Sequence, residues 1–135
     1  MEKIIGIDPG KHTGVAVAVD GVLTEVFETD FWGLFDALED HVGATVIVEL
    51  PNTKHVWHKE AKAEGAIQRT GVNVGSALRE AELIVSYLHR NGWKYRTQRP
   101  QGKVDKDYFK RVTGWSGRTN AHTRDAAMLC FGVKK

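Results

Sequence analysis

The chain has 135 residues, with 41% apolar residues, 27% charged residues and a formal net charge of +2, which is typical of one soluble globular domain over residues 1–135. No apolar stretch reaches membrane-spanning length, and Cys130 is the only cysteine, so this composition excludes a membrane span and a disulfide framework. We therefore expect a protein of the reducing cytoplasm with no membrane partner.

Three strands and a helix are predicted in the N-terminal part. The strands cover residues 3–8, 14–20 and 21–28, and Asp20-Gly21 is a hairpin-turn signal between the last two. After a capping residue, Asp30, apolar residues recur at helical spacing: Phe31, Leu34, Phe35, Leu38 and Val42.

Two strands and three helices are predicted in the remainder. Residues 44–50 (ATVIVEL) form a buried strand, and residues 51–71 form a polar loop or an irregular helix. A long helix over residues 74–88 ends at Asn91-Gly92, and residues 93–99 form a fifth strand. A basic helix over residues 103–112 and a final helix from about residue 120 follow. This order predicts an α/β fold with one mixed five-stranded sheet that is flanked by helices. The sheet consists of a three-strand meander followed by two further strands.

Carboxylates end two of the apolar strands. Asp8 precedes Pro9-Gly10, which we expect to turn the backbone away and leave the Asp8 carboxylate exposed at the sheet edge. Glu49 ends the fourth strand, and His122 and Asp125 share one face of the last helix. Three carboxylates and one imidazole suit Mg²⁺ or Mn²⁺ better than zinc. Taken singly, each residue has an ordinary explanation as a turn, surface or helix-start residue; together they predict a metal cluster.

Basic residues are concentrated in the second part of the chain. Residues 1–53 contain ten acidic and two basic residues, whereas residues 54–135 contain seven acidic and seventeen basic residues. This asymmetry predicts a face that binds a polyanion, although a solvated helix face explains individual residues equally well. The candidate phosphate contacts are Lys103, Lys106, Lys110, Arg111, Arg118 and Arg124, with Arg69 and Arg79.

Three motifs, GIDPGKHTGVAV, VIVELP and HTRDA, resemble the RuvC-type Holliday junction resolvases of the RNase H-like superfamily, particularly the small phage-like members. The resemblance implies that Asp8, Glu49, His122 and Asp125 are catalytic ligands of two Mg²⁺ or Mn²⁺ ions. It also implies a homodimer that makes paired symmetric nicks in four-way DNA junctions, in a bacterial or phage-infected cell. Many family members have a fourth acid where this chain has His122, and the segment after Glu49 is shorter than in typical bacterial relatives.

Other functions fit parts of the sequence. An RNA-processing nuclease of the same superfamily, like the YqgF group, a nuclease for other branched DNA, or a non-catalytic nucleic-acid-binding relative remain alternatives. The first motif also resembles the phosphate loop of actin-like ATPases, which need two such domains around the nucleotide. His55, His58 and Glu60 are in the wrong order for a His-Glu-x-x-His metalloprotease.

Overall fold

Five strands form one mixed sheet in the computed structural model, which describes residues 2–10, 12–51, 78–99 and 105–131. The strands are β1 (Lys3–Asp8), β2 (Thr13–Val19), β3 (Val22–Thr29), β4 (Thr45–Glu49) and β5 (Lys94–Gln98), in the spatial order β3-β2-β1-β4-β5. The first three strands are antiparallel neighbours, whereas β4 runs parallel to β1 and β5 runs parallel to β4. The predicted α/β fold with a mixed sheet is confirmed.

Local sequence signals determine how the hairpin and the first helix form. Asp20 and Gly21 both have positive φ angles, 51° and 82°, as a tight hairpin turn requires. The Asp30 carboxylate accepts a hydrogen bond of 2.7 Å from the Gly33 backbone N–H and caps α1 (Phe31–Glu39) as predicted.

The expected helical position of Val42 is wrong. The helix ends at Glu39, and the backbone then turns through Gly43, whose φ angle is 98°, to enter β4. Val42 lies in this turn, outside the helix, and its side chain is therefore 80% exposed.

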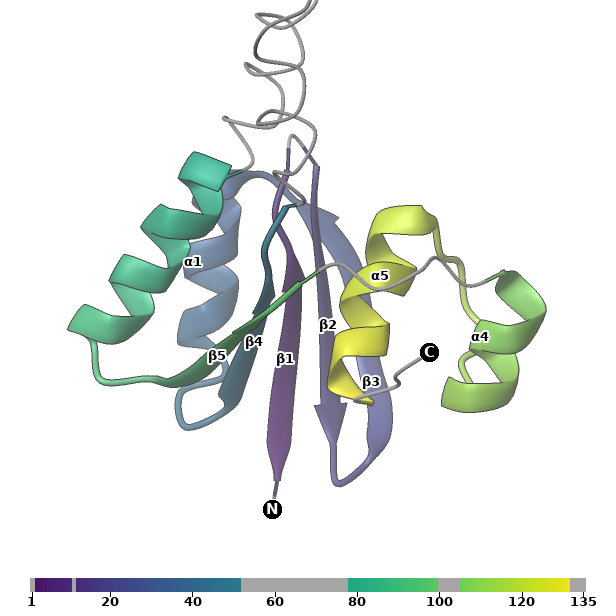
Figure 1. The fold of residues 1–135 in the computed structure, drawn as a ribbon. Coiled ribbons are helices and arrows are strands. Elements are labelled where there is room, and N and C mark those ends of the chain that lie inside the picture. Colours follow the sequence, from purple (N-terminus) through teal and green to yellow (C-terminus); the bar gives the residue numbers. More distant parts are fainter. Residues whose placement is uncertain (1, 11, 52–77, 100–104, 132–135) are drawn as a thin grey trace, which may run out of the picture.

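Helices cover both faces of the sheet (Figure 1). On one face, α1 and the helix of residues 78–90 bury Leu34, Leu38, Ile84 and Leu88 against alternate residues of β1, β2 and β4. On the other face lies α5 (Ala121–Cys130), and α4 (Lys106–Thr113) adds Phe109 to that second core. Among the described residues, no helix has the length and apolarity needed to cross a bilayer.

The two C-terminal helices begin at capping residues. Asp105 caps α4 by accepting from the Tyr108 backbone N–H at 2.8 Å, so the helix begins later than the expected residue 103. Residues 103 and 104, residues 74–77 of the predicted long helix and the predicted loop over residues 52–71 lie outside the described residues. Asn120 caps α5, as the expected start near residue 120 implies.

The backbone of α5 touches the sheet directly at two glycines. A Cβ atom on Gly6 of β1 would overlap the Ala126 carbonyl oxygen, and one on Gly14 of β2 would overlap the His122 carbonyl oxygen. Ala16 and Ala18, on the same face of β2, are also small and buried. At these positions of β1 and β2 the sheet therefore presents only glycine and alanine to α5.

Replacing Gly14 with alanine is expected to lower the free energy of unfolding by about 1–3 kcal/mol, because the new methyl group must push α5 away from β2. Urea denaturation of Gly14→Ala measures this loss. The matched control is Gly10→Ala, since among the described residues a Cβ there would have only the His12 carbonyl oxygen within 4 Å, at 3.8 Å. Equal stability of the two variants would contradict the close contact.

Candidate metal centre

Two of the predicted site residues end neighbouring parallel strands. Asp8 is the last residue of β1 and Glu49 the last residue of β4, and Ile7 lies opposite Val48 in the register of this pair. The carboxyl ends of parallel strands meet at one edge of the sheet, so the two side chains emerge side by side on the face that α5 covers.

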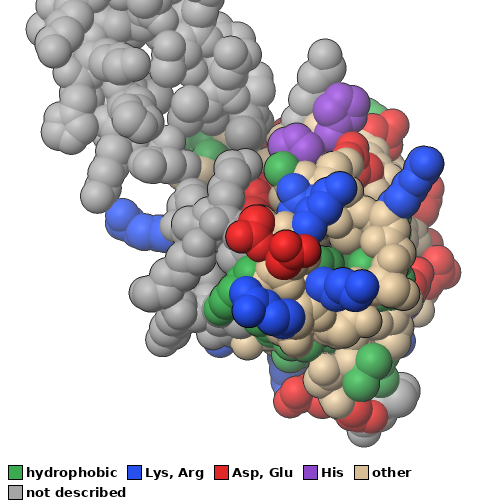
Figure 2. Space-filling model, turned by 90° about the vertical axis from the view of Figure 1, so that its right-hand side faces the viewer, with side chains coloured by type: hydrophobic (Ala, Val, Ile, Leu, Met, Phe, Trp, Pro, Cys, Tyr) green, Lys and Arg blue, Asp and Glu red, His purple; other side chains and the backbone are tan. Residues whose placement is uncertain are grey.

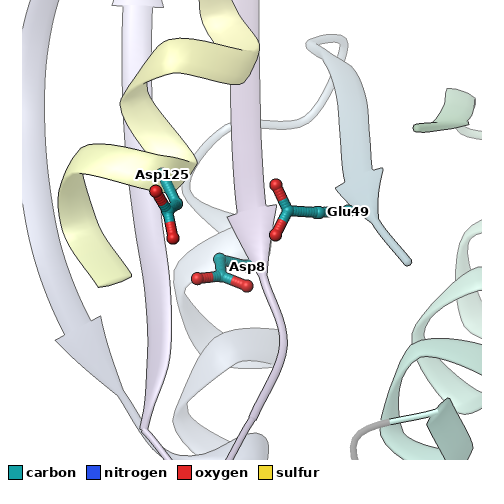
Figure 3. A group of neighbouring side chains, drawn as sticks. All are labelled: Asp8, Glu49 and Asp125. Atoms are coloured by element: carbon teal, nitrogen blue, oxygen red, sulfur yellow. The ribbon is translucent and has the colours of Figure 1, made fainter. Parts of the chain in front are cut away.

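The third carboxylate comes from α5. Asp125 directly precedes Ala126, whose carbonyl oxygen lies against Gly6, so the glycine contact places Asp125 over the end of β1. One oxygen from each of Asp8, Glu49 and Asp125 lies within 4.8 Å of the others. Figure 3 shows the three carboxylates converging from the two strands and the helix. We call these three side chains the acidic cluster.

His122 lies at the rim of the acidic cluster. Its Nδ1 atom is 3.6 Å from an Asp8 carboxylate oxygen, which makes an ion pair whenever the imidazole is protonated. The His122 side chain is 49% exposed, whereas that of Asp8 is 13% exposed. The structure thus brings all four predicted site residues together, with the imidazole on the solvent side.

Burial corrects one expectation about Asp8. The predicted exposed carboxylate is instead largely covered, because α5 packs over the end of β1. Burial first, and then the negative charge of Asp125, raise the pKa of the Asp8 carboxyl above its ordinary value. The nearby His122 and a hydrogen bond with the Glu49 side chain oppose this rise and only partly offset it. The packing of α5 on the sheet therefore holds the carboxylates of Asp8 and Asp125 close together despite the repulsion between their negative charges.

A polar contact that the sequence analysis missed anchors the start of α5. The Asn120 side chain accepts from the Thr123 backbone N–H at 3.0 Å, and the Thr123 hydroxyl accepts from the Asn120 N–H at 2.9 Å. The Asn120 amide also donates to Glu28 of β3, and His12 lies 3.8 Å from the same carboxylate. The Asn-x-x-Thr spacing could have indicated the cap, but nothing in the sequence pairs residue 28 with residue 120.

Glu80 is a second residue that the sequence analysis missed. It lies in the helix of residues 78–90, and its carboxylate accepts a hydrogen bond from the Gly10 backbone N–H. Burial raises the pKa of Glu80, and that hydrogen bond opposes the rise. The other side of this carboxylate is not satisfied in the same way, since Glu80 Oε2 is buried without a hydrogen-bond partner among the described residues.

The predicted basic residues fall into separate groups. Lys106, Lys110 and Arg111 lie on α4, where the Arg111 guanidinium is 5.8 Å from the centre of the Tyr108 ring. Arg79 lies across the sheet from α5 and is 3.5 Å from Glu82, so it is not brought together with the others. Lys103 and Arg69 lie outside the described residues.

Arg118 and Arg124 lie near the start of α5. Arg124 donates from Nη1 to the Thr119 hydroxyl at 3.2 Å, and Arg118 is exposed in the segment just before the helix. On the side of the molecule that carries α4, Lys and Arg side chains alternate with acidic ones instead of forming one basic patch (Figure 2).

The single thiol does not fit a nucleophilic role. Cys130 is the last residue of α5 and is buried against the sheet, and burial raises the pKa of its thiol to about 12. The chemistry that the acidic cluster supports is metal binding, since carboxylate oxygens are the ligands that Mg²⁺ and Mn²⁺ prefer.

Comparison of the chain with models of known protein families and with curated protein sequences finds no match.

Replacing Asp8 with asparagine is expected to stabilise the metal-free protein at neutral pH. A raised folded-state pKa means that the wild-type carboxyl stabilises the fold below its unfolded pKa, and that this stabilisation is lost as pH rises through the folded pKa. The neutral amide escapes this loss. Urea denaturation in a chelator from pH about 4 to about 8 should therefore show the stability of Asp8→Asn overtaking that of wild type as pH rises.

The matched control is Asp36→Asn, which removes an exposed carboxylate on α1. A stability difference between Asp8→Asn and wild type that stays flat with pH, or that favours wild type at neutral pH, would contradict the account of the acidic cluster.

Proposed function

We propose that this protein is a metal-dependent endodeoxyribonuclease that resolves four-way DNA junctions by hydrolysing phosphodiester bonds in opposed strands. The observation that carries the proposal is the convergence of the Asp8, Glu49 and Asp125 oxygens within 4.8 Å of one another. Three carboxylates drawn this close repel one another, and a divalent cation between them converts that repulsion into attraction.

The donor set fits Mg²⁺ or Mn²⁺. All three members of the acidic cluster offer oxygen, and His122 beside Asp8 adds an imidazole nitrogen that Mn²⁺ accepts. The raised pKa of Asp8 supports the same conclusion. Among the described residues, the positive charge near this carboxyl does not compensate for its burial and for the charge of Asp125, and a bound cation would supply that compensation. Two bound ions would activate the attacking water and stabilise the leaving oxygen.

The residues of the site have distinct expected roles. Asp8, whose side chain is far more buried than that of His122, would be the shared metal ligand. Glu49 and Asp125 would supply the other carboxylate oxygens that hold the metal. His122 is half-exposed at the rim, where its imidazole can orient a water molecule.

The substrate is proposed from charge and from the sequence motifs. Lys106, Lys110, Arg111 and Arg118 on and after α4 supply positive charge that a phosphate backbone would neutralise. The three motifs that resemble the RuvC-type resolvases favour a four-way junction over a linear duplex. Paired nicks need two active sites, so we propose a C₂ homodimer, for which Trp32, 76% exposed on α1, is a candidate contact.

Replacing Asp8 with asparagine is expected to abolish junction cleavage while leaving junction binding intact or tighter, because the amide weakens the metal site and removes a negative charge facing phosphate. The loss should exceed the roughly 10–100-fold typical of residues that only support a metal ligand. Gel assays with labelled four-way, flap, duplex and RNA substrates in Mg²⁺ or Mn²⁺ measure it, with Asp36→Asn as the matched control.

The substrate panel also decides between the nuclease classes. Paired symmetric nicks in the four-way junction support the proposal, and mixed dimers with one Asp8→Asn subunit should nick only one strand. Preferred cleavage of RNA would instead support an RNA-processing nuclease, and preferred cleavage of flaps a branched-DNA nuclease. Wild-type nicking by Asp8→Asn would refute the catalytic assignment of the acidic cluster.

A further inference from the structure

A pocket separate from the acidic cluster lies between α4 and the segment of residues 115–119. Its volume is about 420 Å³, within the range of sites that hold small organic ligands. Lys106 and Lys110 line it from α4, and Arg118 and Trp115 line it from the following segment. Asp8, Glu49 and Asp125 do not line it. Figure 2 shows the side of the molecule that carries α4, where Lys and Arg side chains lie among acidic ones.

The charge of the pocket favours an anion. Three cationic side chains, Lys106, Lys110 and Arg118, line it against one carboxylate, Asp107. None of these four side chains forms an ion pair within the described part of the chain. Two flexible ammonium groups and one planar guanidinium suit a phosphate, which accepts several charge-assisted hydrogen bonds at once.

The pocket also has an aromatic wall, formed by Trp115, which a simple surface site for anions would lack. Trp115 is half-buried against the second core, and its Nε1–H is buried without an acceptor among the described residues. Gly117 lies against the indole, where a Cβ atom would come within 2.9 Å of Nε1 and 3.1 Å of two ring carbons. The backbone thus fits closely around the ring, and the pocket combines positive charge with an aromatic surface.

The pocket is connected to the helix that carries the acidic cluster. Thr119 lines the pocket and accepts a hydrogen bond of 3.2 Å from Arg124, the residue directly before Asp125. The segment that forms the wall ends at Asn120, the cap of α5. A strand held at this wall would therefore lie next to the first turn of α5, where His122 is located.

We propose that this pocket binds one nucleotide of a nucleic-acid strand, with its phosphate against Lys106, Lys110 and Arg118 and its base on the Trp115 side. Aromatic side chains take bases of any sequence by stacking, and cations beside them take the backbone. This inference rests on the proposed function and deepens it, because it names a strand-binding site apart from the metal centre.

Nuclear magnetic resonance of the full-length protein in a chelator tests the pocket without cleavage. Of the four tryptophan indole N–H resonances, the one absent in Trp115→Phe belongs to Trp115. A short oligothymidylate should shift this resonance in a saturable way, whereas inorganic phosphate should shift it much less. No shift with the oligothymidylate would overturn the proposal, and equal shifts with both probes would reduce the pocket to a simple anion site and overturn it as well.

Variants locate the phosphate contact. Arg118→Gln is expected to weaken oligothymidylate binding at least about fivefold, because a hydrogen bond to a charged group is lost. The matched control Arg90→Gln removes an exposed arginine at the end of the helix of residues 78–90 and should leave the affinity unchanged. Equal weakening by both variants would mean general charge attraction and would overturn the proposal. The binding experiment contains no metal, so its result does not depend on the nuclease assay. A failed nuclease assay would leave the nucleotide-binding result valid, and a failed binding experiment would leave the nuclease result valid.

Discussion

The contact between α5 and strands β1 and β2 is the constraint on which the acidic cluster depends. Helix and sheet meet there through backbone, since a Cβ on Gly6 or Gly14 would overlap a carbonyl oxygen of the helix. This contact fixes the distance of α5 from the sheet, and through Ala126 it fixes the position of Asp125 relative to Asp8. The Asn120 cap and its hydrogen bond to Glu28 then set where along the sheet the helix begins.

The same arrangement creates an electrostatic cost. Packing α5 over the end of β1 buries Asp8 beside two other carboxylates, and burial together with the charge of Asp125 raises the pKa of Asp8. Proteins commonly retain such a conflict between local stability and arrangement at functional sites. A divalent cation would remove the conflict, which links the packing of the fold to the proposed chemistry.

Much of this structure could be predicted from periodicity and capping. Alternating and apolar runs predict the five strands, Asp30 predicts the cap of α1, and the carboxylates of Asp8 and Glu49 at strand ends predict the sheet edge where the acidic cluster lies. The role of Gly6 and Gly14 could not be predicted, because a glycine in a strand gives no sign of which element approaches it. The contacts of Glu28 with Asn120 and of Glu80 with Gly10 join distant residues by packing alone, and Val42 fitted a helical pattern that Gly43 interrupts.

The most direct measurement is calorimetric titration of the full-length protein with Mn²⁺, comparing wild type with Asp125→Asn and with the exposed-site control Asp36→Asn. If β1, β4 and α5 together build one cation site, wild type and Asp36→Asn should bind Mn²⁺ saturably, and Asp125→Asn should bind at least about 10-fold more weakly. Absence of saturable binding in wild type, or equal affinity in Asp125→Asn, would contradict the metal centre.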